Sequence, residues 1–277
     1  MPATSGEDYS EDQLLDNTTL ILCRTSSTDK VSFIWNTVLL GTDLPTTKKV
    51  MKMVEAICRS FLWTGSSTVS KKASVSWEKV CLPQVAGDLN VMNLVFWNRA
   101  AVAKHLWAVA KKKDCLWIKW IHTFYIKHHT LEHMPIPKNA VRKILESRKL
   151  IGDVQSIQGN LLNRLDQLQN GNSFSIRKLY RLQFPQLPKV PWKGIVLQPR
   201  LHPRFKFILW LALQRRLATV DRLLKFGVQI DQQCALCKLA SEIFDHLFFE
   251  CYVTKEVWSR LGDIADLFKI GNERWNR

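Results

Sequence analysis

The sequence predicts a mainly α-helical protein with minor β structure, limited to short hairpin or extended segments, and a small helical module at the C-terminus. Apolar residues recur at helical spacing over residues 48–63 and again over 93–112. Five prolines between residues 185 and 203 interrupt regular structure before the C-terminal module begins. With 277 residues and 46% hydrophobic content, the chain is long enough to bury one large core or two smaller ones.

Composition and turn signals divide the chain into three parts. Residues 1–30 contain six acidic and two basic residues and no sustained apolar period, so we expect an acidic, mostly disordered leader. Residues 31–170 form the predicted helical region. The turn signal Asn170-Gly171-Asn172 ends that region, and we assign residues 171–277 to the C-terminal domain.

The first predicted helix covers residues 48–63 and has a basic outer face. Its apolar side is predicted to carry Val50, Val54, Ile57 and Phe61. A turn is expected at residues 64–67, and residues 71–80 alternate loosely enough for either a strand or an extended loop. Pro83 and Gly87 mark a further break in regular structure.

The second predicted helix, residues 93–112, is apolar around much of its circumference and is expected to be central to a core. An aromatic and apolar segment follows at 116–126, and residues 138–170 have a helical, polar pattern. In the C-terminal domain we expect a buried helix over 205–213 and a short helix over 220–226. Thr219 is the candidate N-cap of that short helix, and Gly227 is its stop.

Positive charge is the strongest compositional feature. The chain carries 40 Lys and Arg against 24 Asp and Glu, a formal net charge of +16. Such a chain is attracted to nucleic acid through phosphate neutralisation, although an ordinary basic surface would give the same count. The candidate phosphate contacts are Lys71, Lys72, Lys111, Lys112, Lys113, Arg204, Lys206, Arg215 and Arg216. For the three consecutive lysines the plainer alternative is a favourable interaction with the last carbonyls of a helix.

Three cysteines and a histidine near the C-terminus have the spacing of a metal site. Cys234, Cys237, His246 and Cys251 form the pattern C-x2-C-x8-H-x4-C. Two cysteines separated by two residues can bind one cation through a tight turn, and a second pair completes a tetrahedron. Four protein ligands leave no open position for water, so we predict one structural zinc ion that staples the helical module.

Other interpretations of these residues remain open. The three cysteines could be buried thiols beside a capping histidine, or the C-x2-C pair could have a redox role. His128, His129 and His133 offer a second possible metal site, but they lack a cysteine or carboxylate cluster. The seven cysteines are an odd number and widely scattered, which favours a reducing compartment.

Several separated blocks resemble the C-terminal region of plant LINE-type (non-LTR) retrotransposon reverse transcriptases, including the reverse transcriptase zinc-binding domain. The resemblance covers roughly residues 32–262. Its blocks are residues 58–65, 77–83, 87–94, 97–101, 103–107, 116–120, 203–212 and 217–223, followed by the four metal-ligand candidates and Trp258. Family members usually have Gly-Gly where this chain has Gly87-Asp88.

The resemblance does not extend to polymerase chemistry. Reverse transcriptases hold two metal ions with paired aspartates, and this chain contains no Asp-Asp dipeptide. We therefore expect a non-catalytic fragment that binds zinc and the RNA or DNA backbone with low sequence specificity. The alternatives are a zinc-stabilised module for protein interaction or oligomerisation, and a relic without a selected activity.

The expected partners follow from these features. Nucleic acid is the leading partner and a protein partner is the alternative, whereas no small-molecule substrate is expected. The apolar runs are far shorter than the roughly 20 residues needed to cross a bilayer, and no secretory leader opens the sequence. We expect an intracellular protein, nuclear or cytoplasmic, without a membrane partner.

Overall fold

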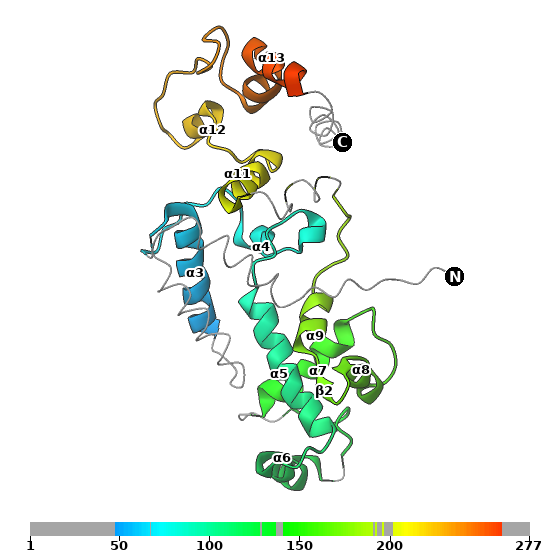
Figure 1. Cartoon of the computed structure of the whole chain (residues 1–277). Coiled ribbons are helices and arrows are strands. Elements are labelled where there is room, and N and C mark those ends of the chain that lie inside the picture. The colour runs from blue at the N-terminus through cyan, green and yellow to red at the C-terminus, as the bar shows by residue number, and fades with distance from the viewer. Residues whose placement is uncertain are drawn as a thin grey trace, which may run out of the picture. The chain divides into compact units, whose positions relative to one another are not determined.

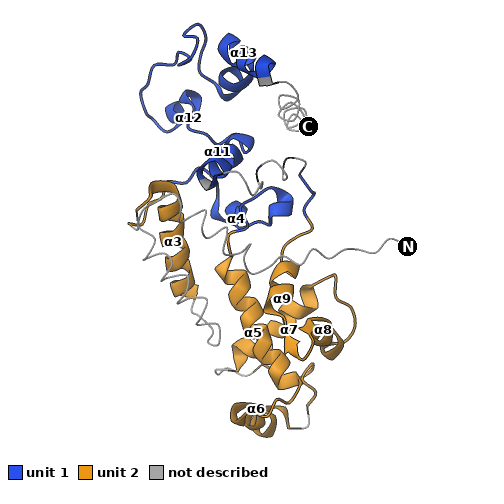
Figure 2. Ribbon diagram, in the orientation of Figure 1, with its two compact units in different colours: residues 1–24, 72–90, 187–277 blue, residues 25–71, 91–186 orange. Residues whose placement is uncertain are grey.

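The computed structural model describes residues 48–66, 68–127, 129–136, 141–190, 192, 196 and 202–261 (Figure 1). The predicted acidic leader, residues 1–30, lies outside the described residues. The chain divides into two compact units, each assembled from separate stretches of sequence (Figure 2). Unit 1 comprises residues 1–24, 72–90 and 187–277, and unit 2 comprises 25–71 and 91–186. The predicted division into contiguous domains stays a prediction.

The described residues are mostly helical with one short two-stranded antiparallel sheet, which confirms the predicted fold class. Unit 2 contains α3 (Lys48–Thr64), α5 (Leu94–Ala110), α6 (Leu116–Ile121), the π-helix η2 (His122–Ile126), α7 (Arg142–Asp153), α8 (Leu161–Gln167), β1 (Gln169–Asn170), β2 (Ser173–Phe174) and α9 (Ile176–Leu182). Unit 1 contains α4 (Trp77–Val80), the 3-10 turn η1 (Gln84–Ala86), α11 (Pro203–Leu213), α12 (Val220–Lys225), the π-helix η3 (His246–Glu250) and α13 (Tyr252–Leu261).

Helix α5 is the centre of unit 2, as its apolar circumference predicted. It packs against α3, α6, α7 and α9, and its buried residues run from Leu94 to Val109. The helix begins where Asn93 accepts a hydrogen bond from the backbone N–H of Phe96 at 3.1 Å. Its C-cap is Lys111, so the predicted end among the three lysines is also correct.

Helix α3 forms where expected, but its buried side is rotated from the predicted one. Met51, Val54, Cys58 and Phe61 are buried, whereas Val50 is exposed. The buried residues keep the i, i+3, i+7 spacing of one helix face, and Val50 lies one residue away from that line. Helical spacing alone allowed either line of apolar residues, and the observed packing selects the line through Met51 and Cys58.

Residues 77–80, for which a strand or extended loop was predicted, form a single helical turn instead. The Ser76 side chain accepts a hydrogen bond from the Lys79 backbone N–H at 3.4 Å, and Glu78 lies in the first turn. Ser before an acidic first turn is a helix-start signal that outweighs loose alternation over so few residues.

The predicted turn at Asn170-Gly171-Asn172 is a β-hairpin. Gln169 pairs with Phe174 and Asn170 with Ser173, which leaves Gly171 and Asn172 as the loop. Gly171 has φ +59, a left-handed conformation that glycine adopts at low cost. Buried Phe174 then packs near Trp107 of α5, with ring centroids 6.1 Å apart.

The core of unit 1 joins α11 to the turn at Gly87. The Trp210 indole N–H donates to the Gly87 carbonyl at 3.0 Å, and Trp210 is fully buried. Gly87 has φ +84, and a Cβ there would lie 2.3 Å from the Trp192 ring. Only one side of α11 is buried, because Phe205 is 59% exposed and Ile208 is 42% exposed. The expected buried helix over 205–213 is therefore present, but only one of its sides is buried.

Asp88, the departure from the usual Gly-Gly pair, is buried in a polar cluster of unit 1. Its carboxylate accepts a hydrogen bond from Gln214 Nε2 at 3.3 Å, and Lys79 Nζ donates to Gln214 Oε1 at 2.9 Å. Burial raises the pKa of Asp88 to about 6, opposed by the charge of Lys79 and a hydrogen bond from Trp210. The Asp88 side chain thus connects the turn at Gly87 to the end of α11.

In the part of the chain that the structure describes, no helix has both the length and the apolar character required to span a membrane.

Candidate metal centre

Cys234 and Cys237 lie in a tight turn whose backbone hydrogen bonds fix both thiols. The Cys234 N–H donates to the Ala240 carbonyl at 2.8 Å, and the Lys238 N–H donates to the Cys234 carbonyl at 2.9 Å. The Leu239 N–H points at Cys237 Sγ from 3.5 Å. Lys238 takes a left-handed φ of +56 to allow this turn. These hydrogen bonds hold the two cysteines in one tight turn, as the C-x2-C spacing requires for binding a single ion.

His246 and Cys251 are the second pair, and a π-helical turn brings them to one side of the chain. They are separated by five positions, which would place them about 140° apart around a regular α-helix. The chain widens instead into η3, and the Cys251 N–H donates to the His246 carbonyl at 2.8 Å. This hydrogen bond closes the wide turn across the x4 spacing of the motif.

The four predicted ligands converge. Their ligand atoms all lie within 4.8 Å of one another, and Cys237 Sγ is 3.3 Å from His246 Nε2. Zinc bonds of about 2.3 Å to sulfur and 2.0 Å to nitrogen place such a pair roughly 3.5 Å apart in a tetrahedron. Cys234 and Cys251 are fully buried, while Cys237 and His246 are partly exposed. The donor set and its geometry therefore fit zinc.

Glu242 connects the Cys234–Cys237 turn to helix α12. One carboxylate oxygen accepts from the Val220 N–H at 3.3 Å, and the other accepts from the Ala235 N–H at 3.2 Å. Thr219 occupies the N-cap position as predicted, but its hydroxyl donates to Asp221 at 2.5 Å and does not cap the helix. Glu242 supplies the capping carboxylate from a distant part of the sequence.

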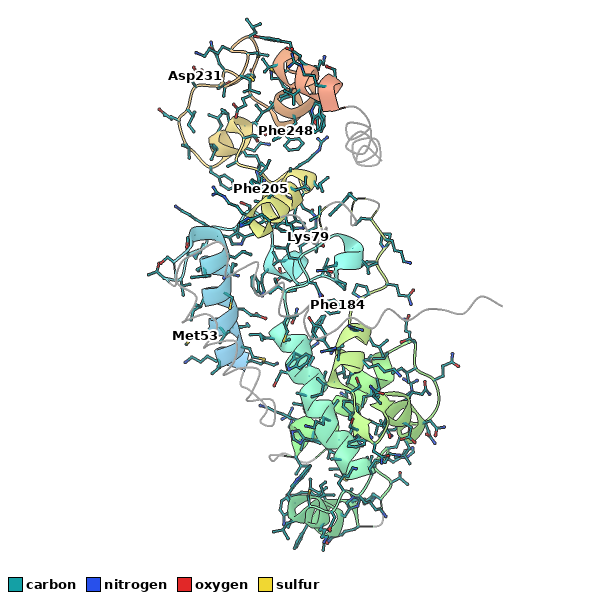
Figure 3. All side chains as sticks on the ribbon, viewed as in Figure 1. Met53, Lys79, Phe184, Phe205, Asp231 and Phe248 are labelled. Carbon is teal, nitrogen blue, oxygen red and sulfur yellow. The ribbon has the colours of Figure 1, made fainter. Side chains whose placement is uncertain are left out.

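Aromatic side chains pack along η3 and α13. The Trp258 indole N–H donates to the Phe248 carbonyl at 2.5 Å, and the Trp258 ring stacks with Phe249. Phe244 lies 4.8 Å from Phe248 between ring centroids. Figure 3 shows Phe248 among the side chains between α12 and α13. These contacts hold η3, and with it His246 and Cys251, against the last described helix.

Arg215 has partners inside the module. Its guanidinium forms two contacts with the Asp245 carboxylate, at 2.8 Å and 3.0 Å, and lies over the Phe244 ring at 5.5 Å. Asp245 directly precedes His246, so this ion pair connects the end of α11 to the second ligand pair. The sequence predicted a phosphate contact at Arg215, and the structure adds a positioning role that sequence spacing did not indicate.

The segment that contains this site belongs to a known type. Residues 174–258 match a family described as zinc-binding in reverse transcriptase. The match covers less than half of the chain and includes all four ligands. Zinc binding is thus supported both by the family and by the converged Cys3His cluster.

A curated protein is similar to a shorter stretch of the chain. A protein of Arabidopsis thaliana with the provisional name ribonuclease H protein is 31% identical over 70 residues. The alignment covers 25% of this chain and 11% of the Arabidopsis protein. No solved structure matches the chain with significance.

The predicted phosphate-contacting residues lie in different surroundings. In unit 1, Arg204, Arg216 and Lys72 are exposed, and Lys206 is half-buried. Lys71, which belongs to unit 2, is also exposed. In unit 2, Lys111 pairs with Asp166 at 2.6 Å, Lys113 lies over the Trp107 ring at 4.9 Å, and Lys112 is exposed. Partial burial and the charge of Arg216 lower the pKa of Arg222. The charge of the Asp221 carboxylate opposes this lowering.

Among the described residues, His129 and His133 do not belong to a comparable cluster. His133 Nδ1 lies 3.0 Å from the Thr130 hydroxyl, and His128 lies outside the described residues. Among the described residues, the Cys3His group is the one set of three or more potential ligands that converges. Sequence reasoning found these four ligands but missed Glu242 and Asp245, which have no local signal because their partners are distant in sequence.

Proposed function

We propose that the chain is a non-catalytic fragment of a LINE-type reverse transcriptase polyprotein, which holds one structural zinc ion and binds the RNA or DNA backbone with low sequence specificity. The carrying observation is the converged Cys3His cluster inside the segment that matches the zinc-binding family of reverse transcriptases. The short similarity to an Arabidopsis protein supports a plant-like origin.

The proposed role of zinc is structural because the protein can fill every tetrahedral position. A bound ion would cross-link the Cys234–Cys237 turn to η3. Catalytic zinc sites keep one position open for water, and four converged side chains leave none. The absence of an Asp-Asp dipeptide from the sequence supports a chain without polymerase activity.

The proposed nucleic-acid surface in unit 1 uses Arg204, Lys206 and Arg216. Arg204 and Lys206 lie in the first part of α11, and Arg216 follows the end of this helix. Arg222 adds a nearby guanidinium. Contacts of this kind position a nucleic acid without reading its bases, so low sequence selectivity is expected.

Zinc stoichiometry tests the metal assignment. Purified protein is expected to contain one zinc per chain, and Cys234→Ser or Cys251→Ser to lose it together with local structure. Cys115→Ser is the matched control because Cys115 is an exposed free cysteine outside the cluster. Full zinc content in Cys251→Ser, or zinc loss in the control, would refute the assignment.

Fluorescence anisotropy against labelled oligonucleotides tests binding. Affinity should fall as salt rises, and Arg204→Ala with Arg216→Ala should reduce the slope of log K against log salt by about 2. Lys255→Ala with Arg260→Ala removes two exposed charges from α13 as a control. Micromolar or weaker binding without a salt slope would exclude the nucleic-acid role.

A second candidate function is protein interaction or self-association. Leu236, between the first two ligands, and Leu239, two residues after Cys237, are exposed, the latter by 83%. An apolar tip on a metal-held turn is a typical contact surface. Size-exclusion chromatography with light scattering would reveal a stable oligomer at high salt, and Leu239→Ser would dissociate it; a monomer at all salt concentrations would exclude self-association.

A further inference from the structure

Helix α6 and the π-helix η2 expose three large aromatic rings on one short segment. Trp117 is 38% exposed, Trp120 46% and Phe124 60%. They follow one another at intervals of three and four residues, which places neighbouring side chains on one helix face. Segment 116–126 lies beyond the end of α5 in unit 2 (Figure 1).

The opposite side of the same segment is anchored. Ile118, Ile121 and Ile126 are buried, so the segment has an apolar face that is already packed. The His122 side chain donates from Nε2 to the Val109 carbonyl of α5 at 2.9 Å. The exposed rings are therefore not a core face awaiting burial. These rings face solvent from a segment whose other side is packed in unit 2.

Ring contacts limit the freedom of the exposed aromatics. Trp120 lies 5.9 Å from Phe124 and 5.0 Å from Tyr125, measured between centroids. Trp117 meets His105 of α5 edge to face at 5.9 Å. Side chains held in this way lose little conformational entropy when a ligand stacks on them.

The surroundings of these rings are basic. Residues 104–127 contain six lysines and a single acidic residue, Asp114. Asp114 pairs with Lys119 at 2.6 Å, with both side chains largely exposed. Lys112, Lys119 and Lys127 are exposed along the same stretch. This combination of aromatic faces and mobile positive charges complements a chain of phosphates that carries uncovered bases.

We infer that segment 116–126 is a stacking platform for unpaired nucleotides, in which Trp117, Trp120 and Phe124 receive bases and the neighbouring lysines receive phosphates. The inference rests on the proposed nucleic-acid function and narrows it to single-stranded RNA or DNA. A duplex covers the faces of its bases, so it can use the lysines but not the rings. Selectivity for base sequence is expected to be low because every base has a face that stacks.

The test compares single strands with duplex on the full-length, zinc-loaded chain. Labelled oligothymidylate and oligouridylate of about 20 nucleotides and a duplex of similar length are titrated. Trp120→Leu with Phe124→Leu keeps apolar side chains but removes the rings, and should weaken single-strand binding about tenfold or more. Duplex binding should change by less than about twofold, since the charges remain.

Two variants separate stacking from other effects. Trp120→Tyr with Phe124→Tyr retains aromatic faces and should keep most of the single-strand affinity. Phe226→Leu removes an exposed ring from unit 1 and should leave binding unchanged. Thermal melts with circular dichroism verify that each variant is folded, as expected for substitutions at exposed positions.

The outcomes distinguish this inference from the proposed function. Unchanged single-strand affinity in the leucine variant, or equal losses for single strand and duplex, would overturn the platform and leave general backbone binding intact. If the unsubstituted chain bound neither form, both would fail. Tighter binding to vesicles with anionic headgroups than to oligonucleotides, retained by the leucine variant, would identify an apolar membrane contact instead and overturn the platform.

Discussion

At the scale of single residues, Asp88 shows how one side chain can connect separate parts of a core. Its carboxylate reaches Gln214 at the end of α11, and Lys79 reaches the same glutamine from α4. Because burial disfavours the charged form, the pKa of Asp88 rises from 3.8 to about 6. The three side chains form a buried polar cluster whose stability depends on pH.

We predict that the free energy of unfolding of Asp88→Asn increases relative to that of the unsubstituted chain as pH rises from about 4 to 7. Between the unfolded pKa of 3.8 and the folded pKa of about 6, the folded state holds a proton that the unfolded state releases, so Asp88 lowers stability as pH rises. With allowance for solvent screening, the relative change should be about 1 kcal/mol by urea unfolding.

Metal loss at low pH affects both proteins alike and cancels in this comparison. Asp153→Asn is the control, because it removes one exposed negative charge from unit 2 without touching the cluster. A difference in unfolding free energy that stays constant with pH for Asp88→Asn would show that this carboxyl is not perturbed.

At the scale of elements, Glu242 makes the Cys234–Cys237 turn and α12 parts of one assembly. Its two oxygens accept from the first residue of α12 and from the residue after Cys234. Helix α12 has only six residues, too few to be stable alone. Its formation therefore depends on the carboxylate that reaches it from the metal-binding segment.

We expect Glu242→Ala to lower the stability of α12 and to weaken zinc binding. Two backbone N–H groups lose their acceptor, at a cost of about 1–3 kcal/mol in total, and the neighbouring turn becomes less ordered. Competition with a chromophoric chelator should show about tenfold weaker zinc binding, in the range found for residues that orient ligands. Glu242→Gln retains one acceptor oxygen, so its zinc affinity should lie between those of the unsubstituted chain and Glu242→Ala. Zinc affinity unchanged in both variants would contradict this role.

At the scale of the whole molecule, the chain has two compact units with separate cores. Unit 2 is organised around α5, whereas unit 1 combines the α11 core with the metal-binding segment. The Cys3His cluster lies within unit 1, so the proposed zinc ion can support only part of the structure directly. Stability measured by one overall transition would combine two different contributions.

Chelation should therefore unfold one part of the chain selectively. We predict that removal of zinc accelerates amide hydrogen exchange over residues 231–258, while the α5 amides keep their protection. Hydrogen exchange with mass spectrometry measures both in one experiment, and zinc addition should restore protection. Equal loss of protection in both regions would show that the units unfold as one.

Sequence reasoning succeeded where the determining interactions are local. The periodic pattern predicted α5 to within a few residues at its ends, and the turn signal at Gly171 predicted the hairpin bend. The spacing of the four ligands predicted their convergence. Each of these depends on residues within a few positions of one another, or on a motif whose spacing is set by one ion.

The remaining features depend on contacts between distant residues. The capping of α12 by Glu242, the ion pair of Arg215 with Asp245 and the burial of Asp88 have no periodic or spacing signal. The wide turn of η3 was also not predicted, because a five-position separation suits neither face of an α-helix. The exposed side of α11 was missed for the same reason, since apolar content alone does not show which side is covered.

The four side chains of the metal centre are unequally accessible to solvent. Cys234 and Cys251 are sealed inside, whereas Cys237 and His246 are partly open to solvent. A thiol chelator or a competing ion would therefore reach the side chains of Cys237 and His246 before those of Cys234 and Cys251. Oxidants would likewise reach the Cys237 sulfur before the sulfurs of Cys234 and Cys251.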